Sequence, residues 1–346
     1  MRHHFQIQHL GLSIDDPQDL VATQAEALLG MFRRAAQLHE PAPGRLRLQV
    51  HDDGNRPEQL EQVPQVWSGT HDGVALAVSR RGSRRRIELP GRAVLDFDLD
   101  RLWASLAVRD DRHGAARSLL LLRLVCDALT RGGHSFLHAA CLAAPRGDGW
   151  QGVVVSAPSH TGKTTTALAL ARSGWRLLGD DVTYVRPPHL GSRVWAFPRA
   201  VHVRPGARKL LSWLENFPLG PANGEGVHPL ALGALGPRAW LDAPWLQPGL
   251  VVVLAPPNRR ATRVEPIDRA TALSHLGSES ISAAPGVCDE DGARDFVTLG
   301  RLVCSAPACR LSVGPDPADA AERLTTFWDA LGVDDRTDVR RGRRAA

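Results

Sequence analysis

Lysine and cysteine are both scarce in this chain. Of its 42 Lys and Arg residues, only Lys163 and Lys209 are lysines. Its five cysteines are odd in number and scattered, which argues against a disulfide framework and predicts free thiols in a reducing compartment. The excess of arginine indicates a compositional bias, so a lysine at a chemically distinct position is informative.

No long hydrophobic run is present. The longest apolar stretch, Leu119–Val125, is interrupted by Arg123, so no membrane span is expected. The first residues, Met1–Phe5, lack the apolar segment of a signal peptide. We therefore expect a cytoplasmic protein without a membrane partner.

Aromatic residues make up only 5% of the chain. No surface that combines aromatic and basic residues is evident in the sequence, so we expect no nucleic-acid partner. The net charge of +5 is mildly basic and is compatible with an acidic partner. Hydrophobic residues make up 43% of the chain and charged residues 23%, which is typical of a soluble globular protein, and 346 residues are enough for two domains.

The hydrophobic patterns divide the chain into three parts. Residues 1–130 predict a β-rich α+β domain, residues 131–331 alternate strands and helices, and residues 332–346 predict a disordered basic tail. In the first part, strands are expected at 5–14, 45–50, 74–78 and 86–89, and helices at 20–38 and 111–131. In the second part, strands are expected at 135–144, 151–156, 175–179, 182–186, 194–197, 201–203, 249–255, 263–266 and 309–313. Helices are expected there at 162–173, 205–214, 268–276, 296–304 and 316–331, with loops at 216–248 and 289–295.

Residues 157–164 read A-P-S-H-T-G-K-T and match a phosphate-binding loop, G-x-x-x-x-G-K-[ST], with alanine at the first glycine position. An apolar strand precedes the loop and a helical pattern follows it, which is the context that the motif requires. Gly162 allows close approach of the backbone to phosphates. Lys163 is expected to reach the β- and γ-phosphates, and Thr164 to place its hydroxyl on Mg²⁺. The predicted nucleotide-binding residues are Ala157, Pro158, Ser159, His160, Thr161, Gly162, Lys163, Thr164 and Thr165.

Two adjacent carboxylates stand at the end of the next apolar strand, with Asp180 seventeen residues after Lys163. In a phosphoryl-transfer enzyme, one such carboxylate holds Mg²⁺ and the other accepts a proton from the attacking hydroxyl. We expect Thr164 and Asp181 to hold the metal, and both Asp180 and Asp181 to take part in catalysis. The sequence leaves open which aspartate is the base, and an exposed acidic turn is the alternative interpretation.

Arginine is the side chain that stabilises a phosphoryl group during transfer. Arg199 and Arg204 follow the aspartates within the same predicted domain, and Arg199 is included among the predicted catalytic residues. Ordinary surface charge is the alternative for both. The arginine-rich run at residues 80–86 predicts a solvated hairpin turn or, alternatively, a docking site for an acidic peptide.

The motif region resembles the HPr kinase/phosphorylase superfamily, whose catalytic domain is similar to that of phosphoenolpyruvate carboxykinase. The matching strings are F-L-H-A-A-C-L-A and V-V-V-S-A-P-S-H-T-G-K-T-T-T-A-L-A-L-A-R-S-G-W-R-L-L-G-D-D-V, and the resemblance covers about residues 135–331. It implies an α/β fold, with a P-loop-containing, phosphoenolpyruvate carboxykinase/HPr kinase-like C-terminal domain beside the β-rich α+β N-terminal domain. It also implies ATP-dependent phosphorylation of a serine hydroxyl and places His138 close to the two aspartates as a catalytic residue.

One signature of that family, a downstream arginine-glycine string, is not recognisable, and Phe197-Pro198-Arg199-Ala200 stands in its place. The pattern is therefore closer to the HPr kinase-like proteins of peptide-biosynthesis clusters, some of which modify a serine of a precursor peptide, including lasso peptides. The leading hypothesis is an Mg-ATP-dependent kinase that phosphorylates a serine of a peptide or small protein, which the N-terminal domain would help to bind. A small-molecule kinase on the same fold and a non-catalytic nucleotide-binding regulatory module are the alternatives. The acceptor, the choice between ATP and GTP, and assembly into a homo-oligomer stay open.

Overall fold

A computed structural model describes residues 2–8, 10–29, 32, 45–52, 64–71, 74–109, 114–223, 225–242, 245–257, 260–283 and 289–342. The chain has a mixed α/β architecture and divides into two compact units. Of the described residues, those up to 134 form unit 1, and residues 135–283 and 289–342 form unit 2. Among the described residues, no helix has the length and apolar character needed to span a bilayer.

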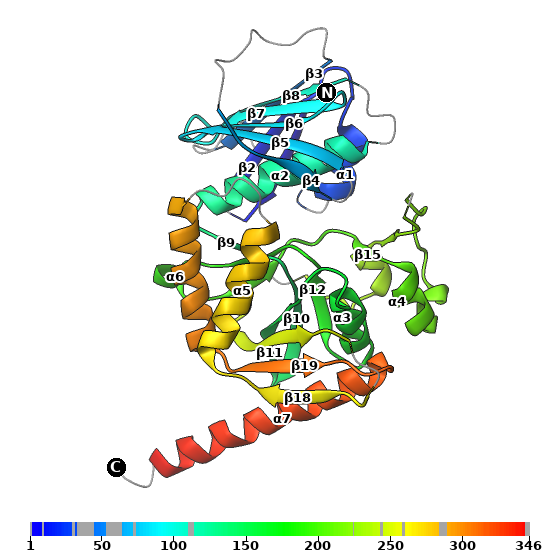
Figure 1. Ribbon diagram of the computed structural model, residues 1–346, viewed down its shortest axis with the longest axis vertical. Coiled ribbons are helices and arrows are strands. Elements are labelled where there is room, and N and C mark those ends of the chain that lie inside the picture. Colours follow the sequence, from blue (N-terminus) through cyan, green and yellow to red (C-terminus); the bar gives the residue numbers. More distant parts are fainter. Residues whose placement is uncertain are drawn as a thin grey trace. The chain divides into compact units, whose positions relative to one another are not determined.

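Unit 1 is built on an eight-stranded sheet with the order β1-β2-β3-β8-β7-β6-β5-β4. Its strands are β1 (Arg2–Ile7), β2 (Leu10–Asp15), β3 (Arg45–Asp52), β4 (Gln65–His71), β5 (Val74–Arg81), β6 (Arg84–Leu89), β7 (Ala93–Asp98) and β8 (Trp103–Val108). Strand β3 pairs in parallel with β2 and β8, and the other neighbours pair antiparallel. Helices α1 (Ala22–Leu29) and α2 (Ala115–Arg131) pack together on one face of this sheet (Figure 1).

Three predictions for unit 1 were wrong in detail. The strand expected at 5–14 is a hairpin, because the chain turns at Gln8, whose φ is 54°. Strands β4, β7 and β8 were not predicted; β7 and β8 are buried along nearly their whole length, so they lack the alternation that marks a half-exposed strand. The helix expected at 20–38 ends at Leu29 in α1, and residues 33–44 lie outside the described residues.

The arginine-rich run at residues 80–86 forms the predicted hairpin turn between β5 and β6, at Gly82. One of its arginines is not solvated, however. Arg85 is 8% exposed and its Nη1 lies 3.0 Å from Oδ2 of Asp127 in α2, while the other oxygen of Asp127 lies 3.0 Å from Nε of Arg123. This buried ion pair connects α2 to the sheet, so part of the run has a structural role.

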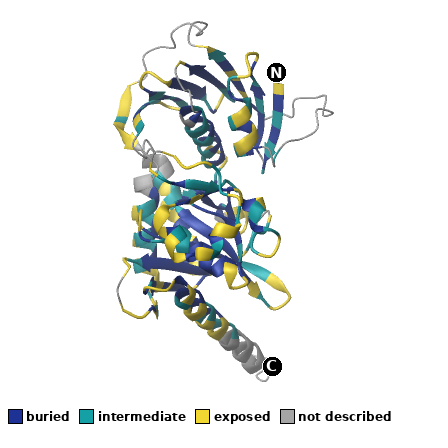
Figure 2. Cartoon of the chain, turned by 90° about the vertical axis from the view of Figure 1, so that its right-hand side faces the viewer, coloured by how far each residue is buried: buried dark blue, intermediate teal, exposed yellow. Residues whose placement is uncertain are grey.

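Unit 2 is built on a six-stranded sheet with the order β12-β10-β11-β17-β19-β18. Its strands are β10 (Ala139–Arg146), β11 (Gly149–Ser156), β12 (Arg176–Gly179), β17 (Pro248–Ala255), β18 (Arg263–Pro266) and β19 (Ala308–Ser312). The central strands β11, β17 and β19 pair in parallel. Parallel strands that carry helices on both faces are buried on both sides, and most residues of these three strands are buried, which Figure 2 draws in dark blue.

The two faces of this sheet pack against different helices. Side chains such as Val153 and Val155 face a core with α3 (Lys163–Arg172) and α7 (Pro317–Gly342). Val154, one residue out of phase, faces the opposite core with α5 (Arg269–Ala283) and α6 (Asp289–Ser305). The sheet therefore holds the end of β11, where the phosphate-binding motif begins, between two layers of helices (Figure 1).

Two smaller sheets complete unit 2. One has the order β14-β13-β9, with β9 (Ser135–Leu137), β13 (Thr183–Val185) and β14 (Val194–Ala196). The other pairs β15 (Val201–Val203) with β16 (His228–Leu230). The strand predicted at 135–144 is wrong in one respect, because it breaks at His138 between β9 and β10, which belong to different sheets.

Several helix boundaries in unit 2 also differ from the predictions. Residues 289–295 are not a loop, because α6 begins at Asp289, and α5 continues to Ala283 rather than ending at 276. The predicted disordered tail is helical as far as Gly342 in α7. The helix expected at 205–214 is split into α4 (Pro205–Leu210) and a 3-10 helix. Residues 289–295 and 332–342 are polar and carry no apolar period, which is the signal that the helix predictions depended on.

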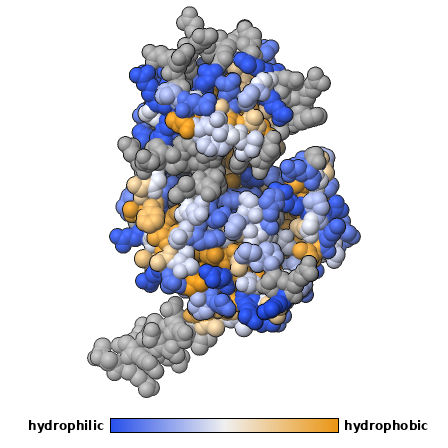
Figure 3. Space-filling view, viewed as in Figure 1, coloured by the Kyte–Doolittle hydropathy of each residue, from blue (hydrophilic) through white to orange (hydrophobic). Residues whose placement is uncertain are grey.

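The surface of Figure 3 is largely hydrophilic, with apolar residues gathered over α6. Phe296 and Val297 of this helix are 56% and 60% exposed. Isolated apolar side chains are ordinary on protein surfaces, and two neighbours do not form a patch of the size that marks an interface.

Candidate active site

The predicted phosphate-binding loop lies between the end of β11 and the start of α3, as its motif requires. Ala157 is fully buried where the loop begins, and residues 158–160 are exposed. Gly162 has a φ of 101°, a backbone conformation that glycine adopts without steric cost. The first N–H groups of an α-helix have no partner within the helix. The start of α3 therefore offers backbone donors and its positive dipole end to an anion.

Lys163 is the first residue of α3 and is only 7% exposed. Its Nζ lies 2.7 Å from Oδ1 of Asp181, so its charge is directed at the aspartate pair. Lys209, the other lysine, is exposed on α4. The two lysines of the chain thus differ completely in their surroundings.

The two aspartates have different partners. Thr164 donates a hydrogen bond of 2.6 Å from its hydroxyl to Oδ2 of Asp180, whereas Asp181 contacts Lys163. Asp180 is 1% exposed, and its second oxygen, Oδ1, is buried without a hydrogen-bond partner. A buried carboxylate oxygen without a donor is costly, so this atom is available for a ligand.

The same asymmetry separates the acidities of the two carboxyl groups. Burial and the neighbouring charge of Asp181 raise the pKa of Asp180 to about 6. Burial acts in the same direction on Asp181, but the hydrogen bond from His138 and the charges of Lys163 and Arg199 outweigh it and hold the pKa of Asp181 well below its usual range. Near neutral pH, Asp181 is therefore the firmly ionised member of the pair.

A tight backbone turn directs the neighbouring side chains to different sides. Asp181 has a φ of 65°, and the N–H of Val182 donates to the carbonyl of Asp180 at 2.8 Å, which closes a three-residue turn around Asp181. Such a φ is uncommon for a residue other than glycine and is stored strain. Gly179, which directly precedes Asp180, must be a glycine, because a Cβ there would lie 2.7 Å from the carbonyl oxygen of Phe197.

His138 occupies the break between β9 and β10, and its Nε2 lies 3.5 Å from Oδ1 of Asp181. The chain passes from the six-stranded sheet to the three-stranded sheet again at Asp180 and Asp181, between β12 and β13. Beside these two passages, the hydroxyl of Thr183 donates to the carbonyl of Ala139 at 2.8 Å. His138 and Asp181 thus meet because both passages between the sheets lie side by side.

Arg199 is also brought to the site, whereas Arg204 is not. The turn after β14 places Nη2 of Arg199 at 3.8 Å from Oδ2 of Asp181. Arg204 instead lies 3.7 Å from Glu225, where both side chains are largely exposed. The geometry favours Arg199 over Arg204 for contact with a phosphoryl group.

The residues fit a magnesium ion that is bound together with phosphates. The described residues contain no cluster of three or more His, Cys, Asp or Glu side chains that could hold a metal ion alone. Mg²⁺ commonly takes one or two protein oxygens and completes its shell with water and substrate phosphates. Thr164 and the unpartnered Oδ1 of Asp180 are oxygen donors of this kind at the start of α3.

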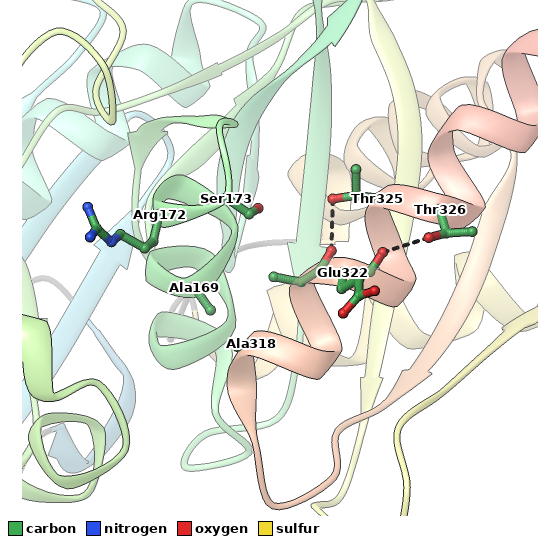
Figure 4. Close-up of a pocket in the computed structure, with 8 residues that line it drawn as sticks. Ala169, Arg172, Ser173, Ala318, Glu322, Thr325 and Thr326 are labelled. Atoms are coloured by element: carbon green, nitrogen blue, oxygen red, sulfur yellow. Dashed lines mark hydrogen bonds between the residues drawn. The ribbon is translucent and has the colours of Figure 1, made fainter.

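A separate hollow lies at the opposite end of α3, where α3 faces α7 (Figure 4). It has a volume of about 360 Å³ and is lined by residues that include Ala169, Arg172, Ala318 and Glu322. Because Lys163 is at the start of α3 and Arg172 at its end, this hollow is distinct from the aspartate pair.

The sequence did not single out His202. It lies in β15 between two buried valines, and its Nδ1 is 3.0 Å from Nη2 of Arg199. The alternation of V-H-V predicts that the histidine side chain points away from the valines. That signal does not indicate its partner, because the partner depends on the turn that carries Arg199.

Comparisons with known proteins do not identify the family of this chain. No protein-family model matches the chain, and no curated protein matches it. Among solved structures, the chain is similar to the Hpr(Ser) kinase/phosphatase from Coxiella burnetii at 14% identity, over 57% of this chain and 98% of that chain, with a TM-score of 0.29. A likeness with so low a TM-score carries no argument, so the proposed function rests on the geometry of the site and on the sequence motifs.

Proposed function

We propose that this protein is an Mg-ATP-dependent kinase that transfers the γ-phosphoryl group to a serine hydroxyl of a peptide or small protein. The convergence of cationic, anionic and hydroxyl side chains at the start of one helix carries the proposal. Contacts of 2.6 to 3.8 Å join these side chains, which are Lys163, Thr164, Asp180, Asp181, His138 and Arg199.

The phosphate-binding end of α3 would hold the nucleotide. Backbone N–H groups of the loop and the ammonium of Lys163 would bind the phosphates, and Thr164 with Oδ1 of Asp180 would hold the metal. Bound Mg²⁺ would neutralise charge on the phosphoryl oxygens. Asp180 suits this role better than Asp181, because its free oxygen is buried beside the threonine hydroxyl.

Asp181 would act on the acceptor. It is partly exposed, so a serine hydroxyl can approach it and pass its proton to the carboxylate during the transfer. As that proton moves to the carboxylate, the serine oxygen bonds to the γ-phosphorus and the bond to the bridging oxygen of ADP breaks. Lys163 and Arg199 would stabilise the charge on the transferred group, and His138 would keep the carboxylate oriented.

The acceptor class is supported by the sequence resemblance to the HPr kinase-like proteins of peptide-biosynthesis clusters. The mildly basic net charge of +5 is compatible with an acidic peptide. A precursor peptide of the lasso type is the specific form of this proposal.

Mass spectrometry tests the proposal directly. Serine-containing peptides encoded beside the gene are incubated with the protein and MgATP, and we expect one added phosphate on a serine. Asp181→Asn should abolish the transfer and retain nucleotide binding, whereas Asp329→Asn, an exposed aspartate on α7, should behave as the unsubstituted protein. Transfer to small molecules alone would favour a small-molecule kinase, and nucleotide binding without any transfer would favour a regulatory module.

A further inference from the structure

The strand that carries His202 fixes the direction in which this side chain points. Val201 and Val203 are buried in the core that contains α3, and side chains alternate along a strand. His202 therefore projects to the opposite side, where it is exposed. Its backbone is fixed by the pairing of β15 with β16, in which His202 stands opposite Pro229.

The turn before β15 brings Arg199 to this histidine. The N–H of Phe197 donates to the carbonyl of Val182 at 2.8 Å, and the N–H of Arg199 donates to the carbonyl of Phe197 at 2.8 Å. This second hydrogen bond closes a three-residue turn, and Pro198, whose ring fixes its φ, is the middle residue of that turn. The guanidinium is largely buried, with 17% of the side chain exposed, and its Nη2 lies 3.0 Å from Nδ1 of His202.

The chemistry of the contact assigns the proton. A guanidinium only donates hydrogen bonds, so Nδ1 of His202 must accept. The imidazole is then neutral and carries its proton on Nε2. The same Nη2 atom lies 3.8 Å from Oδ2 of Asp181. Because Nη2 carries two hydrogens, one can bond to the histidine while the other is directed toward the carboxylate.

We propose that His202 is a positioning residue that holds the guanidinium of Arg199 toward the phosphoryl group to be transferred. This inference rests on the proposed kinase function. Without an acceptor at Nδ1, the charged end of Arg199 would keep, among the side chains that the structure describes, the ion pair with Asp181, and that contact is long at 3.8 Å. His202 touches neither nucleotide nor acceptor in this scheme, so its effect on the transfer would pass through Arg199.

A neighbouring contact of the same kind provides a matched control. Nη1 of Arg208 lies 3.2 Å from Nε2 of His228, whose Nδ1 is 2.9 Å from the carbonyl oxygen of Gly220. This second arginine–histidine contact joins α4 to β16, and the histidine's other hydrogen bond goes to a backbone carbonyl rather than to an aspartate of the site. Arg208→Leu removes it without changing His202.

Steady-state kinetics of peptide phosphorylation test the proposal. His202→Leu should lower kcat about tenfold and leave the KM for ATP within about twofold, because the restraint matters for the transition state rather than for nucleotide binding. His202→Asn, whose side-chain oxygen can replace Nδ1 as an acceptor, should recover most of kcat. Arg208→Leu should leave kcat unchanged. Equal loss in the leucine and asparagine variants, or no loss in either, would overturn the positioning role.

A double-mutant cycle separates positioning from a general structural effect. In the Arg199→Leu background, His202→Leu should lower kcat no further, because the group that His202 positions is already absent. A further tenfold loss in that background would show that His202 acts by another route.

A spectroscopic measurement keeps the inference testable if no acceptor is found. Nitrogen-15 NMR of histidine side chains should show Nδ1 of His202 unprotonated at neutral pH, and the signal should shift in Arg199→Leu but not in Arg208→Leu. A proton on Nδ1 would refute the contact itself. Correct NMR signals together with no phosphorylation of any peptide would instead refute the proposed function and leave the contact intact.

Discussion

Adjacent residues of the same type can have opposite electrostatic surroundings, and the aspartate pair is an example. Asp180 is buried beside a neutral hydroxyl, whereas Asp181 faces Lys163, His138 and Arg199. The turn with φ of 65° at Asp181 produces this difference, because it directs the two side chains to different neighbours. Substitution of each carboxyl group should therefore change stability in opposite directions.

Asp180→Asn should stabilise the nucleotide-free protein at neutral pH and abolish activity. The native pKa of Asp180 is raised from 3.8 to about 6, so the folded protein binds its proton more tightly than the unfolded chain. Stability should consequently fall as the pH rises from about 4 to about 6, and the substitution should remove that fall. We expect a gain of about 1–3 kcal/mol at pH 7, measured by urea unfolding across this pH range. An unchanged pH profile in the variant would contradict the assignment.

Asp181→Asn should destabilise the protein. Lys163 would lose its partner at 2.7 Å while remaining buried, although Asp180 would partly compensate. Asparagine tolerates the left-handed backbone of this position, so the change isolates the charge. We expect a loss of about 1–3 kcal/mol in the same urea experiment. A gain in stability here would show that the ammonium of Lys163 does not depend on Asp181.

At the residue scale, the sequence predicted most of the residues that gather, with Arg204 as the exception, but not how they pair. Gly162, Lys163 and Thr164 follow from a motif whose spacing is set by the helix start. The predicted pairing of Thr164 with Asp181 on the metal differs from the contact that the structure shows, which is between Thr164 and Asp180. The left-handed turn that decides this is not encoded in an aspartate-aspartate string, since aspartate is tolerated at a positive φ but adopts it only in a minority of cases.

At the scale of elements, the close contact between β12 and the end of β14 controls the position of Arg199. A Cβ at Gly179 would lie 2.7 Å from the carbonyl oxygen of Phe197 and 2.8 Å from Cβ of Ala196. The turn that carries Arg199 begins at this carbonyl, because Phe197 accepts the N–H of Arg199.

Gly179→Val should therefore displace the end of β14 and lower kcat, while the protein stays folded. Overpacking of this kind costs about 1–3 kcal/mol, which leaves the protein folded at 25 °C if its stability is typical. We expect at least a tenfold loss of kcat, measured together with thermal unfolding. Gly233→Val, at a position where a Cβ meets nothing within 4 Å, is the control. Full activity in Gly179→Val would mean that the Arg199 turn does not depend on this contact.

The prediction of elements succeeded where the hydrophobic period was clear. The strand 151–156 and the helix after it were predicted from an apolar run followed by a glycine and a helical pattern, and β11 and α3 match them closely. The break at His138 was missed because F-L-H-A-A-C-L-A is apolar on both sides of the histidine. Only the pairing of β9 with β13, a long-range contact, separates it from β10.

At the scale of the whole molecule, every residue of the candidate site belongs to unit 2. Unit 1 contains its own eight-stranded sheet and its own buried ion pair between Arg85 and Asp127. A nucleotide that binds the site should therefore stabilise unit 2 selectively.

Hydrogen exchange with and without MgATP tests this selectivity. Amides of the phosphate-binding loop and α3 should become protected, while the strands of unit 1 keep their exchange rates. At a ligand concentration of about 100 times Kd, the stabilisation should be about 2.7 kcal/mol. Lys163→Met should remove the effect, and Lys209→Met, which changes the exposed lysine, should retain it. Protection in both lysine variants would place the nucleotide elsewhere.

The sequence predicted a β-rich first part and an alternating second part from turn residues and apolar periods, which are local signals. The order of strands in each sheet could not. In unit 1 the parallel neighbours β2, β3 and β8 are far apart in the chain, and nothing local encodes their pairing. A peptide-docking surface on unit 1 could not be predicted from the sequence either, because it depends on which side chains the folded sheet brings together.

The two passages between the six-stranded and three-stranded sheets, at His138 and at Asp180–Asp181, have a mechanical consequence. His138 and Asp181 each lie at one of these passages, so a shift of one sheet against the other would change the separation of Nε2 of His138 from Oδ1 of Asp181, which is 3.5 Å. The activity proposed for the site would therefore depend on how the six-stranded and three-stranded sheets of unit 2 are positioned against each other.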